Sequence, residues 1–172
     1  MRNISNFNNL NDYLPMLNGA IGADLLIIFI VYYTRFFNSK FLMKWYETYR
    51  LSAVIADVLI LVIGMIIARF LYNYIFDSFS LLKFIGLALA IQIIHDILFY
   101  LLFSYIPRGT NKMMDLFKNY ATEVGAGAIA GDSFMMVLTI LLTYYFSGLS
   151  LNSNIIYLIG LVYLIPYILY TK

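Results

Sequence analysis

The sequence has no cysteine, one histidine and few charged residues. The absence of cysteine excludes disulfide bonds, thiolate metal sites and cysteine nucleophiles. Charged residues make up 12% of the chain, whereas a soluble domain has roughly 25%. The net charge of +2 is too small to indicate a nucleic-acid partner. These absences leave few side chains that could perform chemistry.

Hydrophobic residues are present in excess, at 63% of the 172 residues. A soluble domain of ordinary composition is roughly 45–50% apolar, and a small domain has too much surface to bury such an excess. A lipid bilayer can accommodate it, because the bilayer core is itself an apolar solvent. The composition therefore predicts an integral membrane protein whose first partner is the lipid bilayer.

Five apolar stretches are long enough to cross a membrane, since a bilayer core of about 30 Å takes roughly 20 helical residues. They predict an all-α, polytopic transmembrane helix bundle of about five helices, at about 19–37, 53–72, 84–106, 124–146 and 155–170. Residues 1–18 form a polar N-terminal segment ahead of a single transmembrane domain at 19–172. The first two helices share no motif or spacing with the last two, so no repeat is predicted.

The distribution of basic residues predicts the orientation of the bundle. The first loop, the third loop and the C-terminus carry Arg35, Lys40, Lys44, Arg50, Arg108, Lys112, Lys118 and Lys172, against Arg2, Arg69 and Lys83 elsewhere. The N-terminus is therefore expected outside the cytoplasm or in a lumen, and the C-terminus in the cytoplasm.

The third loop has a helical pattern of its own at about 111–121. Met113, Phe117 and Tyr120 recur at spacings of four and three, while Lys112 and Asp115 occupy another face. One interpretation is an amphipathic helix in the membrane interface. The other is a solvated turn that extends the fourth transmembrane helix.

A group of polar residues is predicted near the middle of the membrane. His95 and Asp96 stand at the centre of the third helix with Gln92 one turn earlier, and Asp132 and Ser133 stand near the centre of the fourth. Antiparallel neighbours place these residues at one depth. A buried carboxylate beside an imidazole could form a proton relay or a cation site. The alternative is a hydrogen-bonded clasp between two helices. No metal-binding spacing is present, and no cofactor is predicted.

Two further features suggest helix contacts. Asp24 and Arg69 are expected at similar depth in the first two helices, where they could form an ion pair. Gly125, Gly127 and Gly131 belong to a run of small residues with GxxxG spacing, which favours close packing against the third helix or a subunit of a homo-oligomer.

Short motifs run from the third predicted helix to the fourth: Ile94-His95-Asp96, Pro107-Arg108-Gly109, Asp115-Leu116-Phe117-Lys118, Tyr120, Glu123-Val124-Gly125 and Gly131-Asp132-Ser133. In order and content they resemble uncharacterised multi-pass membrane proteins of large DNA viruses of algae and protists. The resemblance implies a virion or host-organelle membrane and no activity. Without it, the plasma membrane or an organelle membrane is expected.

Three functions follow from these features. The first is a structural or assembly component of a membrane, viral if the resemblance holds, since the glycine run favours helix contacts and no catalytic motif is present. The second is a proton- or cation-conducting channel or carrier that uses the polar cluster. The third is an intramembrane enzyme acting on a lipid, with His95 and Asp96 as acid and base. A role other than catalysis is favoured.

Overall fold

The computed structural model describes residues 2–34, 36 and 38–171. Arg35 and Lys172, two of the basic residues counted above, and Phe37, the end of the first predicted helix, lie outside the described residues. A short 3-10 helix, η1 (Leu10–Asp12), leads into the bundle. The α-helices are α1 (Tyr13–Tyr33), α2 (Lys40–Tyr49), α3 (Leu51–Ile75), α4 (Leu81–Tyr105), α5 (Lys112–Val124), α6 (Gly127–Phe146) and α7 (Leu151–Leu169).

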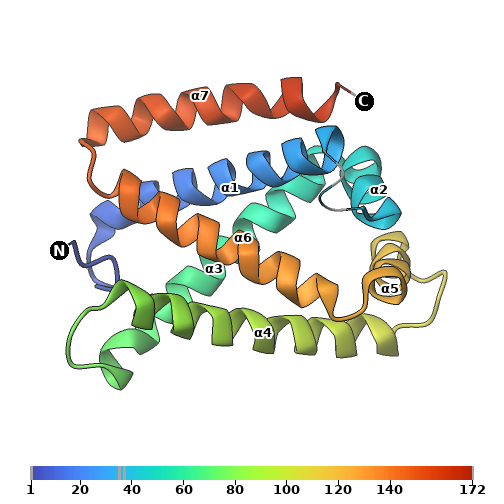
Figure 1. Cartoon of the computed structure of the whole chain (residues 1–172), viewed down its shortest axis with the longest axis horizontal. Helices are drawn as coiled ribbons and strands as arrows, with labels where there is room; N and C mark the ends of the chain where they lie inside the picture. Colours follow the sequence, from blue (N-terminus) through green and yellow to red (C-terminus); the bar gives the residue numbers. More distant parts are fainter. Residues whose placement is uncertain (1, 35, 37, 172) are drawn as a thin grey trace.

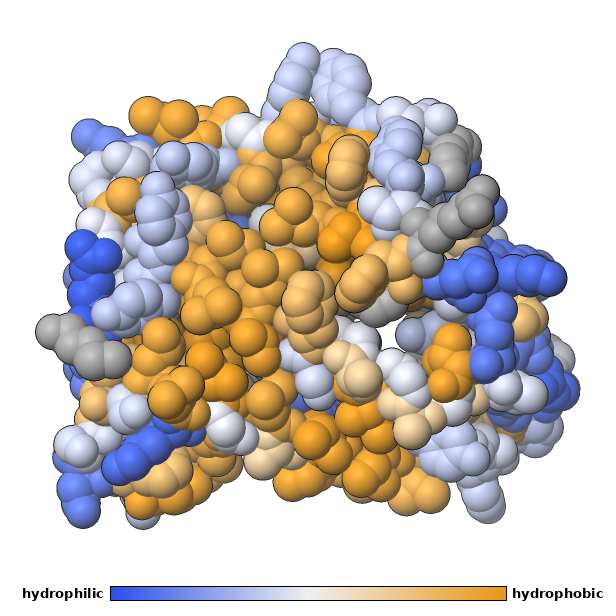
Figure 2. All heavy atoms as spheres, viewed as in Figure 1, coloured by the Kyte–Doolittle hydropathy of each residue, from blue (hydrophilic) through white to orange (hydrophobic). Residues whose placement is uncertain are grey.

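Five of these helices are long and apolar enough to cross a membrane: α1 together with η1, α3, α4, α6 and α7. Apolar side chains form a broad band between two hydrophilic ends of the molecule (Figure 2). The predicted fold class, an all-α bundle of five spanning helices, is confirmed. The chain is therefore an integral membrane protein.

The helix α1 begins six residues before the predicted start at Gly19, so residues 13–18 do not belong to a polar segment. Pro15 does not prevent this early start, because proline is tolerated in the first turn of a helix, where the amides have no intrahelical partner. Met16 and Asn18 are buried in the bundle. Residues 13–18 thus form the first turns of a helix whose start the sequence had predicted at Gly19.

The short helices α2 and α5 lie together at one end of the bundle, where the C-terminus also lies, and the N-terminus is at the other end (Figure 1). The helix α5 is a separate element and not an extension of the fourth spanning helix. It starts at Asn111, whose side chain accepts from the amides of Met113 and Met114. The helix α2 was not predicted. It starts at Ser39, which accepts from the amide of Leu42.

Arg69 has a different partner from the predicted one. Its guanidinium is fully buried and lies 3.3 Å from Asp12, and it also donates to the carbonyl oxygens of Asn6 and Asn9. The early start of α1 places Asp12 at the depth of Arg69 and moves Asp24 to the middle of its helix. The predicted Asp24–Arg69 pair is therefore replaced by a contact that fixes the N-terminal segment to α3.

Close helix packing occurs at Gly19 and not at the predicted glycines around the start of α6. A Cβ atom at Gly19 would lie 2.5 Å from the hydroxyl of Thr143 and 2.8 Å from the carbonyl oxygen of Thr139, so α1 and α6 approach closely there. Gly125 and Gly131 have nothing within 4 Å of such a Cβ, and Gly127 has only its own neighbour Val124. Within the described chain, the GxxxG run does not pack against another helix, because its glycines face the open space of a cavity.

The bundle contains two similar halves, α1–α2–α3 and α4–α5–α6. Each half is a spanning helix, a short helix at the α2/α5 end and a returning spanning helix, and the two halves run in the same direction along the bundle (Figure 1). The turns into α3 and α6 have nearly the same backbone. Arg50 has φ 48° and ψ −121°, and Gly125 has φ 54° and ψ −131°. The structure therefore reveals a parallel repeat that the sequence did not.

Burial follows the repeat as well. Counted back from the last residue of each helix, the four buried residues of α4 match three buried residues of α1 and one of η1. The pairs are Phe84 with Asp12, Ala88 with Met16, Gln92 with Ala20, and Phe103 with Val31. The residue types differ in all four pairs, which explains why no sequence repeat was visible.

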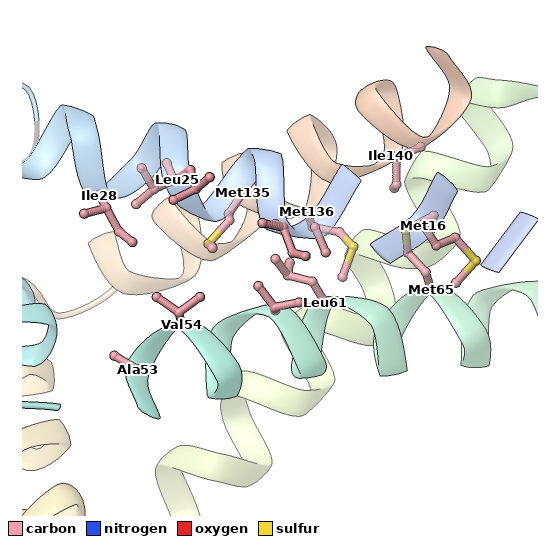
Figure 3. Close-up of a cluster of buried hydrophobic side chains, with 14 of the residues drawn as sticks. Met16, Leu25, Ile28, Ala53, Val54, Leu61, Met65, Met135, Met136 and Ile140 are labelled. Atoms are coloured by element: carbon pink, nitrogen blue, oxygen red, sulfur yellow. The ribbon is translucent and has the colours of Figure 1, made fainter. Parts of the chain in front are cut away.

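The core of the bundle lies between α1, α3 and α6. Figure 3 shows its side chains meeting from these helices: Met16, Leu25, Ile28, Ala53, Val54, Leu61, Met65, Met135, Met136 and Ile140. Unbranched methionine side chains adapt to irregular gaps between helices. The helix α7 packs on the outside of α1 and has no counterpart in the repeat.

Candidate functional site

A cavity of about 910 Å³ lies toward the α2/α5 end of the bundle. Its walls come from α2, α3, α4, α5 and the start of α6, and Figure 2 shows a hollow on this face near α5. Apolar and aromatic side chains make up most of the lining. The carboxylates of Asp57, Asp96 and Asp132 reach the cavity from three different spanning helices, and the described lining contains no lysine or arginine.

The predicted residues of the third spanning helix line this cavity. Gln92 Nε2 donates to Asp96 Oδ1 at 2.7 Å, and His95 Nδ1 lies 3.2 Å from the same oxygen. Gln92 is buried, whereas the His95 side chain is 38% exposed and stacks on Phe99. The second oxygen of Asp96, Oδ2, is buried and has no hydrogen-bond partner among the described residues.

Asp132 joins this group from α6. It interacts electrostatically with Asp96 and Asp57, and it makes no hydrogen bond within the described chain. Ser133 does not line the cavity, because consecutive residues of a helix point about 100° apart. The structure thus brings Gln92, His95, Asp96 and Asp132 to one cavity and leaves Ser133 outside it.

Two further aspartates belong to the same region. Trp45 Nε1 donates to Asp57 Oδ2 at 3.0 Å, and the hydroxyl of Tyr46 donates to Asp24 Oδ1 at 3.2 Å. The Tyr46 hydroxyl also interacts with Asp57. Asp24 is fully buried, and its Oδ2 atom has no partner among the described residues. The short helix α2 therefore supplies the donors for two carboxylates of the spanning helices.

The tyrosines of the short helices respond to these carboxylates. Burial raises the pKa of Tyr46 well above its usual value, and the negative charges of Asp57 and Asp24 raise it further. Burial also raises the pKa of Tyr120 on α5, followed by the charge of Asp132. Both hydroxyls therefore keep their protons, and that of Tyr46 donates to Asp24.

The four acids occupy matched positions in the two halves of the repeat. Asp24 and Asp96 each stand nine residues before the last residue of their helix, Tyr33 in α1 and Tyr105 in α4. Asp57 and Asp132 each stand seven residues after the turn residue that precedes their helix. The repeat thus places two pairs of carboxylates around the axis of the bundle.

The short helices are tied together over the cavity. The carboxylate of Glu123, at the end of α5, accepts from Ser39 Oγ at 2.5 Å and from the amides of Lys40 and Phe41 at the start of α2. Partial burial raises the pKa of Glu123, but these hydrogen bonds and the charge of Lys40 outweigh that effect and lower the pKa below its usual value. An acid at a helix N-terminus is favourable for the same reason.

The cavity combines carboxylates with a lining that is mostly apolar and aromatic. In the part of the chain that the structure describes, no three His, Asp or Glu side chains converge closely enough to hold a metal ion. Sequence reasoning missed Asp57, Trp45, Tyr46 and Tyr120 as members of the site. The signal that could have found Asp57 is its seven-residue distance from the turn before α3, which Asp132 repeats in α6. Comparisons with family models, with curated proteins and with solved structures give no match to this chain.

Proposed function

We propose that the chain is a membrane protein that binds a cation in its acid-lined cavity and exchanges it for protons. The observation that carries this proposal is the charge imbalance of the cavity. Asp57, Asp96 and Asp132 line it from three helices, and no lysine or arginine lines it among the described residues.

An unpaired carboxylate away from bulk water is costly, so it either takes up a proton or acquires a positive partner. Among the described residues that line the cavity, His95 is the one side chain that can carry a positive charge. Further positive charge is then supplied from solution, as protons or as a bound cation. A site that alternates between these two states couples cation binding to proton release.

The position of the cavity favours a carrier or a receptor over an open pore. Its inner wall includes Leu61 and Met135, and both belong to the packed core between α1, α3 and α6 (Figure 3). A cation would thus enter and leave by the α2/α5 end unless the bundle rearranges. Movement of the short helices, which Glu123 ties together, would control that entrance.

The test is cation-dependent proton movement in liposomes that contain the purified chain and a trapped pH dye. An inorganic cation or an organic ammonium ion is added outside, and the internal pH is followed for wild type, Asp132→Asn and Asp77→Asn. Asp77 is a matched control because it is an exposed carboxylate at the end of the bundle away from the cavity.

A proton flux that Asp132→Asn removes and Asp77→Asn retains would support the proposal. If no cation produces a pH change with wild type, or if both variants behave alike, the cavity does not exchange cations for protons.

A structural or assembly role is the second candidate. Gly127 is exposed on α6 and meets no other helix of the described chain, so it remains available to a second copy. Chemical crosslinking in liposomes tests this role. Gly127→Leu should reduce a crosslinked dimer without unfolding the monomer, and an unchanged dimer would reject contact through this surface.

A further inference from the structure

In the first half of the repeat, each of the two acids receives a hydrogen bond from the short helix α2. The carboxylate of Asp57 receives the indole N–H of Trp45, and the carboxylate of Asp24 receives the hydroxyl of Tyr46. Trp45 and Tyr46 stand five and four residues before Arg50, the turn residue that precedes α3. In this half, side chains of α2 occupy the space in front of both acids.

The second half lacks one of these donors. Five residues before the equivalent turn residue, Gly125, stands Tyr120, which matches Trp45. Four residues before it stands Ala121, at the position of Tyr46. A methyl group can neither fill the volume of a phenol ring nor donate a hydrogen bond.

Position 121, where the second half has no phenol ring, lines the cavity together with two acids. Ala121, Asp96 and Asp132 all line the cavity. Asp96 Oδ2 is buried without a hydrogen-bond partner among the described residues, and the partners of its Oδ1, Gln92 and His95, belong to its own helix. Asp24, its counterpart in the first half, instead receives a donor from the short helix, the hydroxyl of Tyr46 on its Oδ1. The donor that the sequence omits on α5 is thus missing at the place where the cavity lies.

We infer that this position receives the ammonium head of a protonated organic amine, whose N–H groups donate to Asp96 and Asp132 in place of a tyrosine at position 121. The inference rests on the proposed function and names the class of cation. The amine would leave its apolar body against the aromatic wall of the cavity.

The size and the lining of the cavity favour an organic cation over a metal or alkali ion. Its volume of about 910 Å³ falls within the range of about 300–1,000 Å³ found for small-molecule pockets. The aromatic wall is continuous across three helices, since the ring of Phe117 lies 4.9 Å from that of Trp45 and 5.0 Å from that of Phe99. Aromatic faces attract cations and also pack against apolar groups.

The experiment is a binding assay on the full chain in detergent micelles. Trp45 is the only tryptophan and lines the cavity, so its fluorescence reports a ligand there, and equilibrium dialysis gives an independent affinity. The probes are 2-phenylethylammonium, the neutral 2-phenylethanol of similar shape, and sodium ions. The variants are Asp96→Asn, Ala121→Tyr and the control Asp77→Asn.

The amine should bind to wild type, and both cavity variants should weaken it about tenfold or more, as expected for the loss of a charge-assisted hydrogen bond or of the space for the head group. Asp77→Asn should bind as wild type does. Asp96→Asn preserves the side-chain shape, so it tests the inference even if Ala121→Tyr does not fold.

Three results would overturn the inference. Equal binding of 2-phenylethanol would mean that the cavity selects apolar shape alone. Amine binding that Ala121→Tyr leaves unchanged would place the head group elsewhere. A response to sodium with none to the amine would also reject it, while a proton flux driven by sodium in liposomes would keep the proposed function.

Discussion

The helices α1 and α6 share the most extensive contact between two helices of the bundle. This contact depends on the absence of a side chain at Gly19. We predict that Gly19→Ala destabilises the protein, whereas Gly131→Ala does not. A Cβ atom at Gly19 would lie 2.5 Å from Thr143 Oγ1, 2.8 Å from the carbonyl oxygen of Thr139 and 2.9 Å from the amide nitrogen of Thr143. At Gly131 no atom lies within 4 Å of the added carbon.

The size of the effect follows from comparing the two variants. Both replace glycine by alanine inside a spanning helix, so both gain similar helix propensity, about 0.5–1 kcal/mol. This gain cancels in the difference between them. What remains is the overpacking of α1 against the backbone of α6, which typically costs about 1–3 kcal/mol. Because two of the three close atoms belong to the backbone of α6, side-chain rotation cannot relieve the contact.

The assay is reversible unfolding in mixed micelles with an increasing fraction of denaturing detergent, followed by circular dichroism. Gly19→Ala should unfold at a lower detergent fraction than wild type, and Gly131→Ala at the same fraction or a higher one. Equal midpoints for the two variants, or a lower midpoint for Gly131→Ala, would refute the packing of α1 on α6 described here.

Substitutions also test three other contacts. Arg69→Met should destabilise the fold by about 3–5 kcal/mol in the same unfolding assay, because it leaves Asp12 buried without its charged partner. Adding Asp12→Asn should recover part of the lost stability, and no recovery would contradict the ion pair. Tyr46→Phe should lower the free energy of unfolding by about 1–3 kcal/mol, since the buried carboxylate of Asp24 loses its donor. Tyr120→Phe breaks no hydrogen bond of this kind and should lower it less. The reverse order would contradict the difference between the two halves of the repeat. The pKa of Glu123 is lowered, so its contacts stabilise the protein fully above pH 4.5, the ordinary pKa of a glutamate, and are lost as the pH falls through the lower pKa of the folded protein. The fluorescence of Trp45 on α2 should therefore change in acid in wild type and not in Glu123→Gln. Identical pH profiles for the two proteins would exclude the contact of Glu123 with α2.

Much of the candidate site depended on facts that no single sequence window contains. Gln92, His95, Asp96 and Asp132 could be grouped in advance, because consecutive antiparallel helices place their midpoints at one depth. The place of Asp57 in the site could not be predicted, because it depends on α2 folding back so that Trp45 Nε1 lies 3.0 Å from Asp57 Oδ2. Such a contact is set by a turn at Arg50 in a conformation that non-glycine residues rarely adopt.

The amino-acid sequence alone determined that the chain crosses a membrane five times. Apolar runs of about 20 residues have few alternatives, because every backbone polar group in a bilayer must be paired within its own helix. The sequence also predicted a helical pattern at about 111–121, but it left open whether this segment was a separate helix or an extension of the fourth spanning helix. The structure decides for a separate helix, Lys112–Val124, which the side chain of Asn111 caps.

Only the tertiary structure decided which helices touch and what their polar groups face. Gly19, and not the glycine run of α6, makes the close contact, and Arg69 pairs with Asp12 instead of Asp24. Lipid is as apolar as the side chains themselves, so the hydrophobic pattern that marks a spanning helix does not mark the face that packs. Steric fit and pairing of buried charges choose that face, and both depend on all the helices at once.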